Sequence, residues 1–356
     1  MPNNGTIPFT LNTSTPGYNL VGNPYPSTID AATFIAANPN IAGTLYFYVH
    51  SLSMDANGVF PQGTNYAVWN SLGSTAATHI LNDVHFVPVA PSGIIQVGQG
   101  FFVKATGSGT INFTNAMRVG NNGNQNFRTA AVEKDRLWLN LQTATGLDIN
   151  QILVGYITGA TRGVDRNYDG LSFGNTGSYL SSKIAGDDYA IQGRSLPFDS
   201  SDEVPLGFKA DTAGIYKIAL TNSDGLFTGN QEVFLQDNLI GITHNIKGAA
   251  YSFSSQTGTF NARFSLVYAK TLGSDSSIFV PNSVQVYKEG EWFRVKTNGI
   301  TMQEVSVFDM AGRLIFKQSG INDITTLLEG LSQVNEAMLV KIVSQDNQTV
   351  TVKVIN

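Results

Sequence analysis

The sequence of 356 residues contains no cysteine, and only 13% of its residues are charged. The absence of cysteine excludes disulfide bonds, thiolate metal sites and a cysteine nucleophile. The net charge is −5, and lysine and arginine do not cluster as a phosphate-binding face requires, which argues against nucleic acid as a partner. No apolar run approaches the roughly 18 residues of a membrane-spanning helix. We therefore expect no membrane span in this chain.

Neutral polar residues take the place of the missing charges. Glycine, asparagine, serine and threonine are abundant, and aromatic residues make up 10% of the chain. This mixture is typical of turn-rich β-sandwiches, and the length suits two or three domains of about 100 to 150 residues. We predict an all-β fold of tandem β-sandwich modules, jelly-roll or Ig-like, that ends in a small Ig-like sandwich.

The first predicted module spans residues 1–128. A strand at 17–26 ends in an Asn-Pro-Tyr-Pro turn, because proline cannot donate to a β-ladder and holds its predecessor extended. A short helix is expected over 31–37, with Asp30 or Ser27 as its N-cap. Further strands are expected at residues 44–49, 66–69, 94–97, 101–105 and 110–113.

The second predicted module covers residues 129–270. It follows a glycine- and asparagine-rich loop at 120–126. Apolar runs that alternate with turn signals predict a jelly-roll or Ig-like sandwich here. Its strands are expected at residues 137–141, 151–158, 215–220, 232–236, 249–253 and 264–268. The small polar residues 271–280 then predict a linker to a last module, 281–356.

The last module is organised around residues 305–316, Val-Ser-Val-Phe-Asp-Met-Ala-Gly-Arg-Leu-Ile-Phe. Alternating apolar residues on both sides of a short polar stretch predict a β-hairpin. Gly312 provides the positive φ of a short turn, and Asp309 can accept hydrogen bonds from the backbone of that turn. Four more strands are expected, at residues 283–287, 292–296, 339–343 and 349–355. Together they predict a two-sheet sandwich.

This module resembles the C-terminal sorting domain of the type IX secretion system, which exports proteins across the outer membrane of Bacteroidota. The resemblance covers residues 279–356. It rests on the hairpin sequence, on Leu-Val-Lys-Ile at 339–342 and on the closing Thr-Val-Lys-Val-Ile at 351–355. The chain departs from many members at 336–338, Glu-Ala-Met, where they have Gly-Tyr, and at its end, where they have a lysine-rich tail. The signal subtype and its cleavage are therefore left open.

The resemblance implies a non-catalytic export signal whose partners are the type IX outer-membrane translocon and its β-barrel shuttle protein. The residues that it points to for recognition are Phe308, Asp309, Gly312 and Arg313 in the hairpin and Lys353, Val354 and Ile355 at the end of the chain. For Arg313 a second interpretation is that it pairs with Asp309 and pins the turn. For the module as a whole, the alternative is an ordinary Ig-like end domain.

The implied location is the cell surface or the medium, reached through the periplasm and the outer membrane. Residues 1–5, Met-Pro-Asn-Asn-Gly, offer neither the basic nor the apolar region of a signal peptide. Because an exported protein needs such a signal, we expect this chain to be the C-terminal part of a longer protein.

The first module carries a resemblance of its own. Residues 19–27, 98–104 and 113–118 resemble a module that precedes sorting domains in large surface proteins of the same bacteria. No activity follows from this resemblance. An alternative function for residues 1–270 is carbohydrate binding or adhesion to surface glycans, with aromatic rings such as those of Trp69 and Trp138 stacking on sugars. Aromatic side chains are, however, more often found in sandwich cores.

An oxygen-rich loop at residues 165–170, Asp-Arg-Asn-Tyr-Asp-Gly, is a candidate calcium site. Asp165, Asn167 and Asp169 match the first half of an EF-hand loop, but Thr176 stands where that loop needs a bidentate glutamate. Two interpretations stay open. One is a calcium site of another type, completed by Asp187, Asp188 or Asp202, and the other is a solvated turn. No other cofactor is expected.

The sequence contains no convincing catalytic constellation, and we expect a protein that is not an enzyme. Gly-Leu-Ser-Phe-Gly at 170–174 matches the nucleophile-elbow pattern, but the residues that follow cannot open a helix. The four histidines, at positions 50, 79, 85 and 244, lack a paired metal-binding spacing. Asp-Thr-Ala at 211–213 resembles the O-glycosylation sequon of Bacteroidota, which makes Thr212 a candidate glycosylation site.

Overall fold

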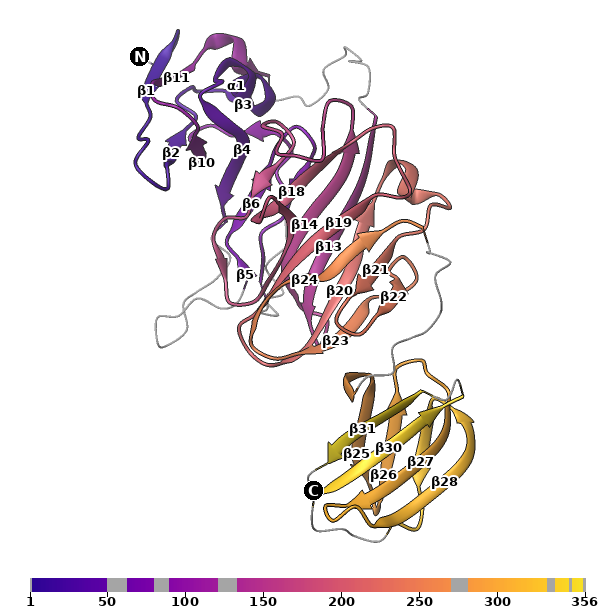
Figure 1. Cartoon of the computed structure of the whole chain (residues 1–356). Helices are drawn as coiled ribbons and strands as arrows, with labels where there is room; N and C mark the ends of the chain where they lie inside the picture. The colour runs from indigo at the N-terminus through magenta and orange to yellow at the C-terminus, as the bar shows by residue number, and fades with distance from the viewer. Residues whose placement is uncertain are drawn as a thin grey trace, which may run out of the picture. The chain divides into compact units, whose positions relative to one another are not determined.

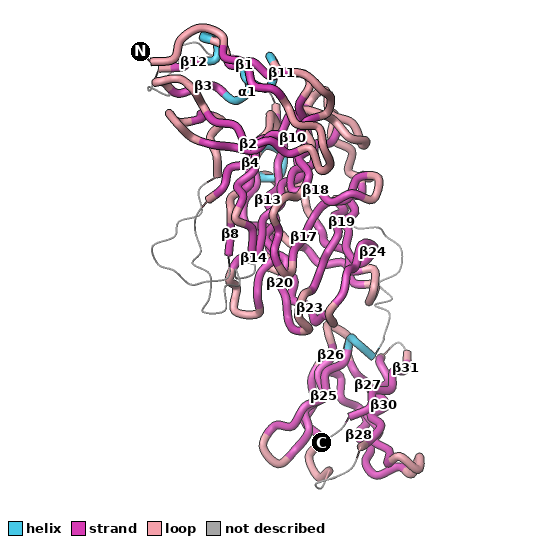
Figure 2. Tube along the Cα trace, turned by 90° about the vertical axis from the view of Figure 1, so that its left-hand side faces the viewer, coloured by secondary structure: helices cyan, strands magenta, loops and turns pink. Residues whose placement is uncertain are grey.

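The computed structural model describes residues 2–49, 63–79, 90–120, 133–269, 281–331, 337–345 and 348–354. Over these residues the chain consists mainly of β-strands, as Figure 1 and Figure 2 show. The predicted all-β, multi-sandwich fold is confirmed. Nearly all of the loop predicted at 120–126 and the whole linker predicted at 271–280 lie outside the described residues. No helix in the described part of the chain is long and apolar enough to cross a membrane.

The chain divides into two compact units. The first comprises Met1–Gln236 and Thr243–Lys270, and the second comprises Asp237–Ile242 and Thr271–Asn356. Nearly all of residues 1–270, which the sequence divides into two predicted modules, thus belong to one unit.

Small sheets make up the N-terminal part of the first unit. Its strands are β1 (Ile7–Thr10), β2 (Tyr18–Gly22), β3 (Thr28–Asp30), β4 (Ile41–Tyr48), β6 (Tyr66–Trp69), β7 (Ser74–Thr75), β9 (Ile94–Ile95), β10 (Gly100–Ala105), β11 (Thr110–Phe113) and β12 (Arg118–Val119). β1 pairs with β11, a five-stranded sheet has the order β2-β10-β4-β6-β7, and a three-stranded sheet has the order β12-β3-β9. The strands expected at 66–69 and 110–113 have the predicted bounds.

The predicted helix is confirmed as α1 (Ala31–Ala37), with Asp30 as its N-cap. The Asp30 carboxylate accepts a hydrogen bond from the Thr33 backbone N–H at 2.7 Å. The helix directs Phe34 into the core, where its ring stacks on Phe113 at a centroid distance of 4.9 Å. Short 3-10 helices occur as η1 (Asn115–Met117), η2 (Gly225–Thr228) and η3 (Pro281–Ser283).

Residues 133–269 are dominated by one long, twisted sheet (Figure 1). Its strands are β13 (Lys134–Thr143), β14 (Asp148–Ile157), β15 (Gly170–Leu171), β17 (Tyr179–Ile184), β18 (Asp187–Ser195), β19 (Glu203–Ala210), β20 (Gly214–Ser223), β21 (Phe234–Asp237), β22 (Ile242–Asn245), β23 (Tyr251–Ser255) and β24 (Gly258–Val267). The order is β22-β21-β24-β19-β17-β18-β14-β13-β20-β23, with β15 paired to β18. A separate sheet joins β16 (Asn175–Thr176), β5 (Gly63–Thr64) and β8 (Thr78–His79) in that order.

A shared hydrophobic cluster explains why the two parts of the first unit are not separate bodies. Tyr46 and Val68 from the five-stranded sheet pack in the same buried cluster as Leu153 and Ile191 from the long sheet. Phe173, which follows β15, lies among the rings of Tyr18, Tyr46 and Tyr66. Burial of this much apolar surface holds the two parts together.

The second unit is a two-sheet sandwich. Its strands are β25 (Val284–Glu289), β26 (Trp292–Thr297), β27 (Met302–Asp309), β28 (Leu314–Asp323), β29 (Thr325–Leu328), β30 (Met338–Ser344) and β31 (Thr349–Val354). One sheet has the order β25-β26-β29 and the other β28-β27-β30-β31. Alternate residues of both sheets, such as Val295, Val305 and Val340, meet in a closed core, as the period-2 pattern predicts.

Candidate functional site

The turn between β27 and β28 is organised by Asp309. The Oδ1 atom of Asp309 accepts hydrogen bonds from the backbone N–H groups of Ala311 and Arg313, both at 2.9 Å. Oδ2 accepts a hydrogen bond from Nε of Arg313 at 2.7 Å. Gly312 has a φ of 80°, which glycine adopts without steric cost. The predicted turn geometry is therefore confirmed.

The ionic state of Asp309 follows from these contacts. The hydrogen bonds from the Arg313 backbone and side chain lower the pKa of the Asp309 carboxyl, because they stabilise its charged form. The interpretation that Arg313 pairs with Asp309 is also confirmed. The Arg313 side chain is nevertheless 82% exposed, so the pair holds the turn in the solvent rather than in the core.

Three apolar side chains around this turn are exposed. Met310 is 54% exposed, Leu314 is 53% exposed and Ile315 is 42% exposed. They follow one another closely along a turn that Asp309 and Gly312 hold in one conformation. Clustered apolar side chains on a fixed surface element mark a contact surface more often than scattered ones do.

The register of the four-stranded sheet brings the end of the chain beside the hairpin. Phe308 lies opposite Leu314 on β28 and opposite Leu339 on β30, and Leu339 lies opposite Lys353 on β31. Residues directly opposite each other in an antiparallel sheet point to the same face. Leu314, Phe308, Leu339 and Lys353 therefore form one row across all four strands, which we call the outer row. Leu314 and Lys353 are exposed and the other two are half-buried, so this face is turned to solvent.

The neighbouring row contains two more of the predicted recognition residues. Asp309 lies opposite Met338, and Met338 lies opposite Val354. Met338 is fully buried, so it anchors this end of the sheet in the core. With strands roughly 4.8 Å apart, β27 and β31 are about 10 Å apart. Four predicted residues from two distant segments thus meet at one end of one sheet. Ile355 lies outside the described residues.

Lys353 and Val354 also line a groove at the open side of the sandwich. β25 and β31 are the edge strands of their sheets, and a groove of about 670 Å³ runs between them. Val286 and Tyr287 line it from β25, and Thr351, Val352, Lys353 and Val354 line it from β31. Edge strands offer unpaired backbone groups to a partner.

The candidate calcium loop lies in the first unit, between β14 and β15, where backbone donors occupy its carboxylates. Oδ2 of Asp165 accepts hydrogen bonds from the N–H and the hydroxyl of Thr161. Oδ1 of Asp169 accepts one from the Gly193 N–H at 2.7 Å, and Oδ2 accepts one from the Asp165 N–H. Burial raises the pKa of Asp169 to about 6.

The other proposed ligands do not converge on this loop. Oδ1 of Asn167 accepts from Nη1 of Arg166 at 2.9 Å. Asp188 accepts hydrogen bonds from Ser181 and Lys183, and Asp202 pairs with Arg194. Across the described ranges, no group of three or more His, Cys, Asp or Glu side chains is placed to hold a metal ion. Calcium binding stays a prediction.

Arg166 gives this loop a structural role that the sequence does not indicate. Its guanidinium donates to the carbonyl oxygens of Ile35, Asn38 and Ile41 at 3.1, 2.8 and 2.7 Å. These carbonyls belong to the C-terminal end of α1 and the start of β4. The Ile35 and Asn38 carbonyls also accept the backbone N–H groups of Asn38 and Ile41, at 3.2 and 3.4 Å, so Arg166 adds a second, charged donor at this helix end from another part of the unit. Only the fold brings together residues that are 125 to 131 positions apart, so no local signal could have found these contacts.

The remaining sequence candidates occupy ordinary positions. Thr212 is exposed in the turn between β19 and β20, and its backbone oxygen accepts a hydrogen bond from the Tyr216 hydroxyl at 2.6 Å. Ser172 follows the two-residue strand β15 and precedes a strand, β16, where the nucleophile elbow needs a helix. His244 lies 2.8 Å from the Ala249 carbonyl oxygen. Residues 50 and 85 lie outside the described residues.

Comparison with known families assigns the larger part of the chain. A family model described as "Domain of unknown function (DUF8693)" matches residues 1–268. The chain belongs to the DUF8693 family. A second model, described as "Domain of unknown function (DUF8694)", matches residues 272–356. No curated protein matches the chain.

The two family matches agree with the structural units. The DUF8693 match ends at residue 268, two residues before the first unit ends. The DUF8694 match begins at residue 272, one residue after the start of Thr271–Asn356, the longer segment of the second unit. The hairpin, the outer row and the groove between β25 and β31 all belong to the DUF8694 match. The calcium candidate and the Arg166 contacts belong to the DUF8693 match.

Proposed function

We propose that residues 271–356 are the export signal of a protein that a type IX translocon and its β-barrel shuttle protein deliver to the cell surface or the medium. The observation that carries this proposal is the outer row. Residues that the resemblance points to, 45 positions apart in the chain, lie at one end of one sheet beside an exposed apolar turn. In this proposal the unit is recognised in its folded form and carries out no chemistry.

The proposed recognition has two components. Leu314 and Ile315 provide apolar surface that a partner can bury, which supplies most of the binding free energy. Lys353 and Arg313 provide positive charge at the two ends of this surface, so the partner should present an acidic rim, which adds specificity and speed of association. The Asp309 turn fixes the apolar side chains in place, so little conformational entropy is lost on binding.

The glycan-binding alternative for residues 1–270 receives less support. The guanidinium of Arg136 lies over the Trp138 ring at 4.9 Å, and Nε1 of Trp138 donates to the Ser74 carbonyl at 2.8 Å. The Trp69 ring packs on the core of the N-terminal part and closes over Gly93. Both rings are thus engaged in internal contacts. Glycan binding stays a prediction.

The proposal is tested by following the protein in a Bacteroidota host. The full chain is placed behind a signal peptide and a tag, beside a version that ends at residue 270, in wild type and in a translocon-deficient strain. We expect the full chain outside the cell only where the translocon is present, and the shorter version in the periplasm of both strains. Equal export of both versions, or periplasmic retention of the full chain in both strains, would contradict the proposal.

A further inference from the structure

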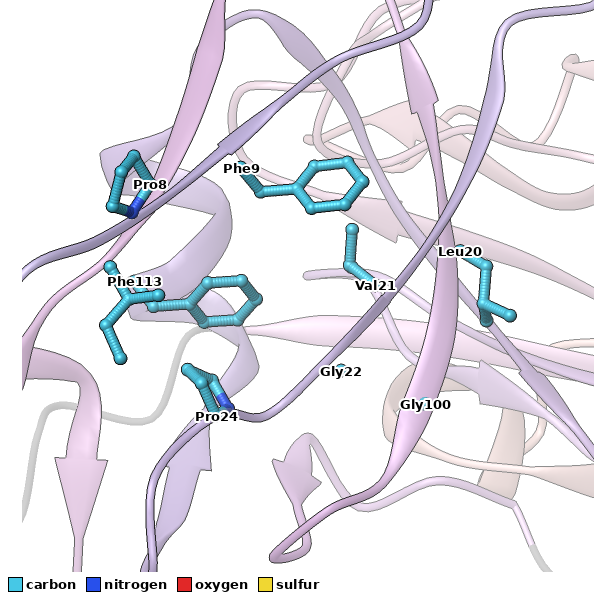
Figure 3. A pocket seen from close by; sticks show the side chains of 9 residues that line it. Pro8, Phe9, Leu20, Val21, Gly22, Pro24, Gly100 and Phe113 are labelled. Atoms are coloured by element: carbon cyan, nitrogen blue, oxygen red, sulfur yellow. The ribbon is translucent and has the colours of Figure 1, made fainter. Parts of the chain in front are cut away.

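An apolar groove opens in the first unit between β1 and β2, as Figure 3 shows. Its volume is about 440 Å³, within the range of roughly 300 to 1,000 Å³ that is usual for ligand clefts. The residues that line it are Ile7, Pro8, Phe9, Leu20, Val21, Gly22, Pro24, Gly100 and Phe113. None of them carries a charged or polar side chain.

The groove lies between two strand edges. Among the described strands, β1 pairs with β11 alone and β2 pairs with β10 alone. Each strand therefore turns one edge toward the groove. β1 contains Pro8, which has no N–H to donate, whereas β2 contains no proline, so β2 is the edge better suited to accept another strand.

Hydrogen bonds at both ends of the groove fix the spacing between β1 and β2. At one end, Asn19 accepts from the Asn12 N–H at 2.8 Å and donates to the Asn12 carbonyl at 3.0 Å. At the other end, the Asn3 amide donates to the Pro24 carbonyl at 2.9 Å, and the Tyr25 hydroxyl donates to the Gly5 carbonyl. The groove is therefore a preformed feature of the fold.

The walls of the groove leave apolar surface uncovered. Val21 and Phe113 are buried and form its floor, and the Phe9 ring lies over Val21 in Figure 3. Phe9 is 37% exposed and Leu20 is 60% exposed. An occupant that covers both side chains would remove this surface from water.

We propose that this groove binds an extended, uncharged peptide segment of another protein, which adds to the free edge of β2 and places alternate apolar side chains between Phe9 and Leu20. The backbone of such a segment pairs with the edge of β2, which an acyl chain cannot do. The described residues of the lining carry no ionisable group, so a charged segment would lose its hydration there without compensation. This site lies outside the segment on which the proposed export function rests.

The first test titrates the full chain with a capped pentapeptide, acetyl-Thr-Val-Thr-Val-Thr-amide, whose length matches the five residues of β2. Amide chemical shifts of the protein report binding. Two control peptides are used, one with lysine in place of valine and one with N-methylated backbone amides. We expect saturable shifts confined to β1, β2 and their turn, with affinity at least tenfold weaker for both control peptides.

Variants separate the groove from other surfaces. Leu20→Asp should weaken binding of the pentapeptide at least tenfold, whereas Ile215→Asp, at an equally apolar position that is 53% exposed on β20, should leave it unchanged. Equal binding of the N-methylated peptide would show apolar adsorption and overturn the proposal. Concentration-dependent dimerisation that Leu20→Asp abolishes, with no peptide binding, would assign the groove to a second copy and also overturn it.

Discussion

Two loops of this chain combine aspartate, arginine and glycine, and they serve opposite purposes. In the loop at 165–170, Arg166 points into the first unit and Asp169 is buried. In the turn at 309–313, Arg313 and Met310 are exposed, and the Asp309 carboxylate accepts hydrogen bonds from Ala311 and Arg313 of its own turn. The residue types are the same, but Arg166 and Asp169 of the first loop form hydrogen bonds inside the unit, whereas Arg313 of the second loop lies in the solvent.

The two aspartates record this difference in their pKa values. Burial raises the pKa of Asp169 to about 6, because the charged carboxylate has lost its hydration. Hydrogen bonds from Arg313 lower the pKa of Asp309, because they stabilise the charged form. A polar motif in a sequence is therefore a weak guide to function until the fold shows whether its side chains face the core or the solvent.

The largest effect is expected for Arg166→Ala. The substitution removes a charged hydrogen-bond donor from the carbonyls of Ile35, Asn38 and Ile41, the first two of which keep longer bonds from the backbone N–H groups of Asn38 and Ile41. A hydrogen bond from a charged group contributes about 1.5 to 3 kcal/mol. We expect a loss of roughly 3 to 5 kcal/mol in the free energy of unfolding of the first unit. Amide hydrogen exchange in peptides from α1 and β4 measures this loss of stability.

Arg162→Ala is the matched control for that prediction. Arg162 lies in the same connection, and its exposed side chain pairs with exposed Asp199 at 3.3 Å, a kind of surface pair that contributes little to stability. It also lies 3.3 Å from buried Asp202, which keeps its pair with Arg194 when Arg162 is removed. If Arg162→Ala destabilised the first unit as much as Arg166→Ala, the internal role of Arg166 would be wrong.

The next effect is the pH dependence that Asp169 imposes on the first unit. Its pKa is about 6 in the folded chain, against 3.8 for an unperturbed aspartate. Between these values the folded state therefore binds more protons at Asp169 than the unfolded state does, so the stabilisation from this group is complete below about pH 4 and is lost as the pH rises through 6. The difference amounts to about 3 kcal/mol. Denaturant titrations between pH 4 and 7 should show this fall, and Asp169→Asn should remove it.

A smaller effect is expected for Gly312→Val in the second unit. Among the described residues, no atom stands within 4 Å of the position that a Cβ would take, so the cost arises from the backbone conformation. A side-chain-bearing residue at a φ of 80° costs roughly 1 to 2 kcal/mol, and a β-branched residue suits this conformation least. Gly312→Asn should cost less, because asparagine tolerates this conformation. Equal losses in the two variants, measured by hydrogen exchange across β27 and β28, would contradict the turn geometry.

The smallest effect on stability is expected for Arg313→Ala. The side chain is exposed, so unfolding of the second unit should change little. The pKa of Asp309 should rise toward its ordinary value, because one of the groups that lower it is lost. For wild type, the stabilisation from Asp309 is present above about pH 4 and is lost as the pH falls through its lowered pKa. An NMR titration of the Asp309 carboxyl that is unchanged in Arg313→Ala would contradict the pairing.

The second unit is the part whose strands the sequence predicts best. Strands such as β26 and β30 alternate between buried and more exposed positions, and polar turns such as the one at Asp309 and Gly312 separate the strands, so local signals suffice there. The sequence does not predict the four-residue strand β29, because polar and apolar residues do not alternate in Thr325–Leu328. The sequence also does not predict that Phe308 and Lys353 lie in one row, because that depends on how the strands are aligned with one another, and no local pattern determines this register.

The strands of the first unit are harder to predict from the sequence, for a physical reason. β17, β18 and β19 are interior strands of the long sheet, and the middle of β18, Tyr189 to Arg194, is buried at every position. Strands with both faces buried lose the alternation on which prediction depends. The sequence also offers no sign that the groove at β1 and β2 is open, because openness depends on which strand edges lack a neighbour.

The central claim is that an export partner recognises the outer row of the second unit. The most direct measurement compares export of the full chain in a Bacteroidota host for Leu314→Asp and Ile215→Asp, two apolar strand residues that are both 53% exposed. Leu314 lies in the outer row and Ile215 lies in the first unit. The account predicts at least a tenfold loss of exported protein for Leu314→Asp, with folded protein retained in the periplasm, and no loss for Ile215→Asp. Normal export of Leu314→Asp, or equal losses for both variants, would contradict it.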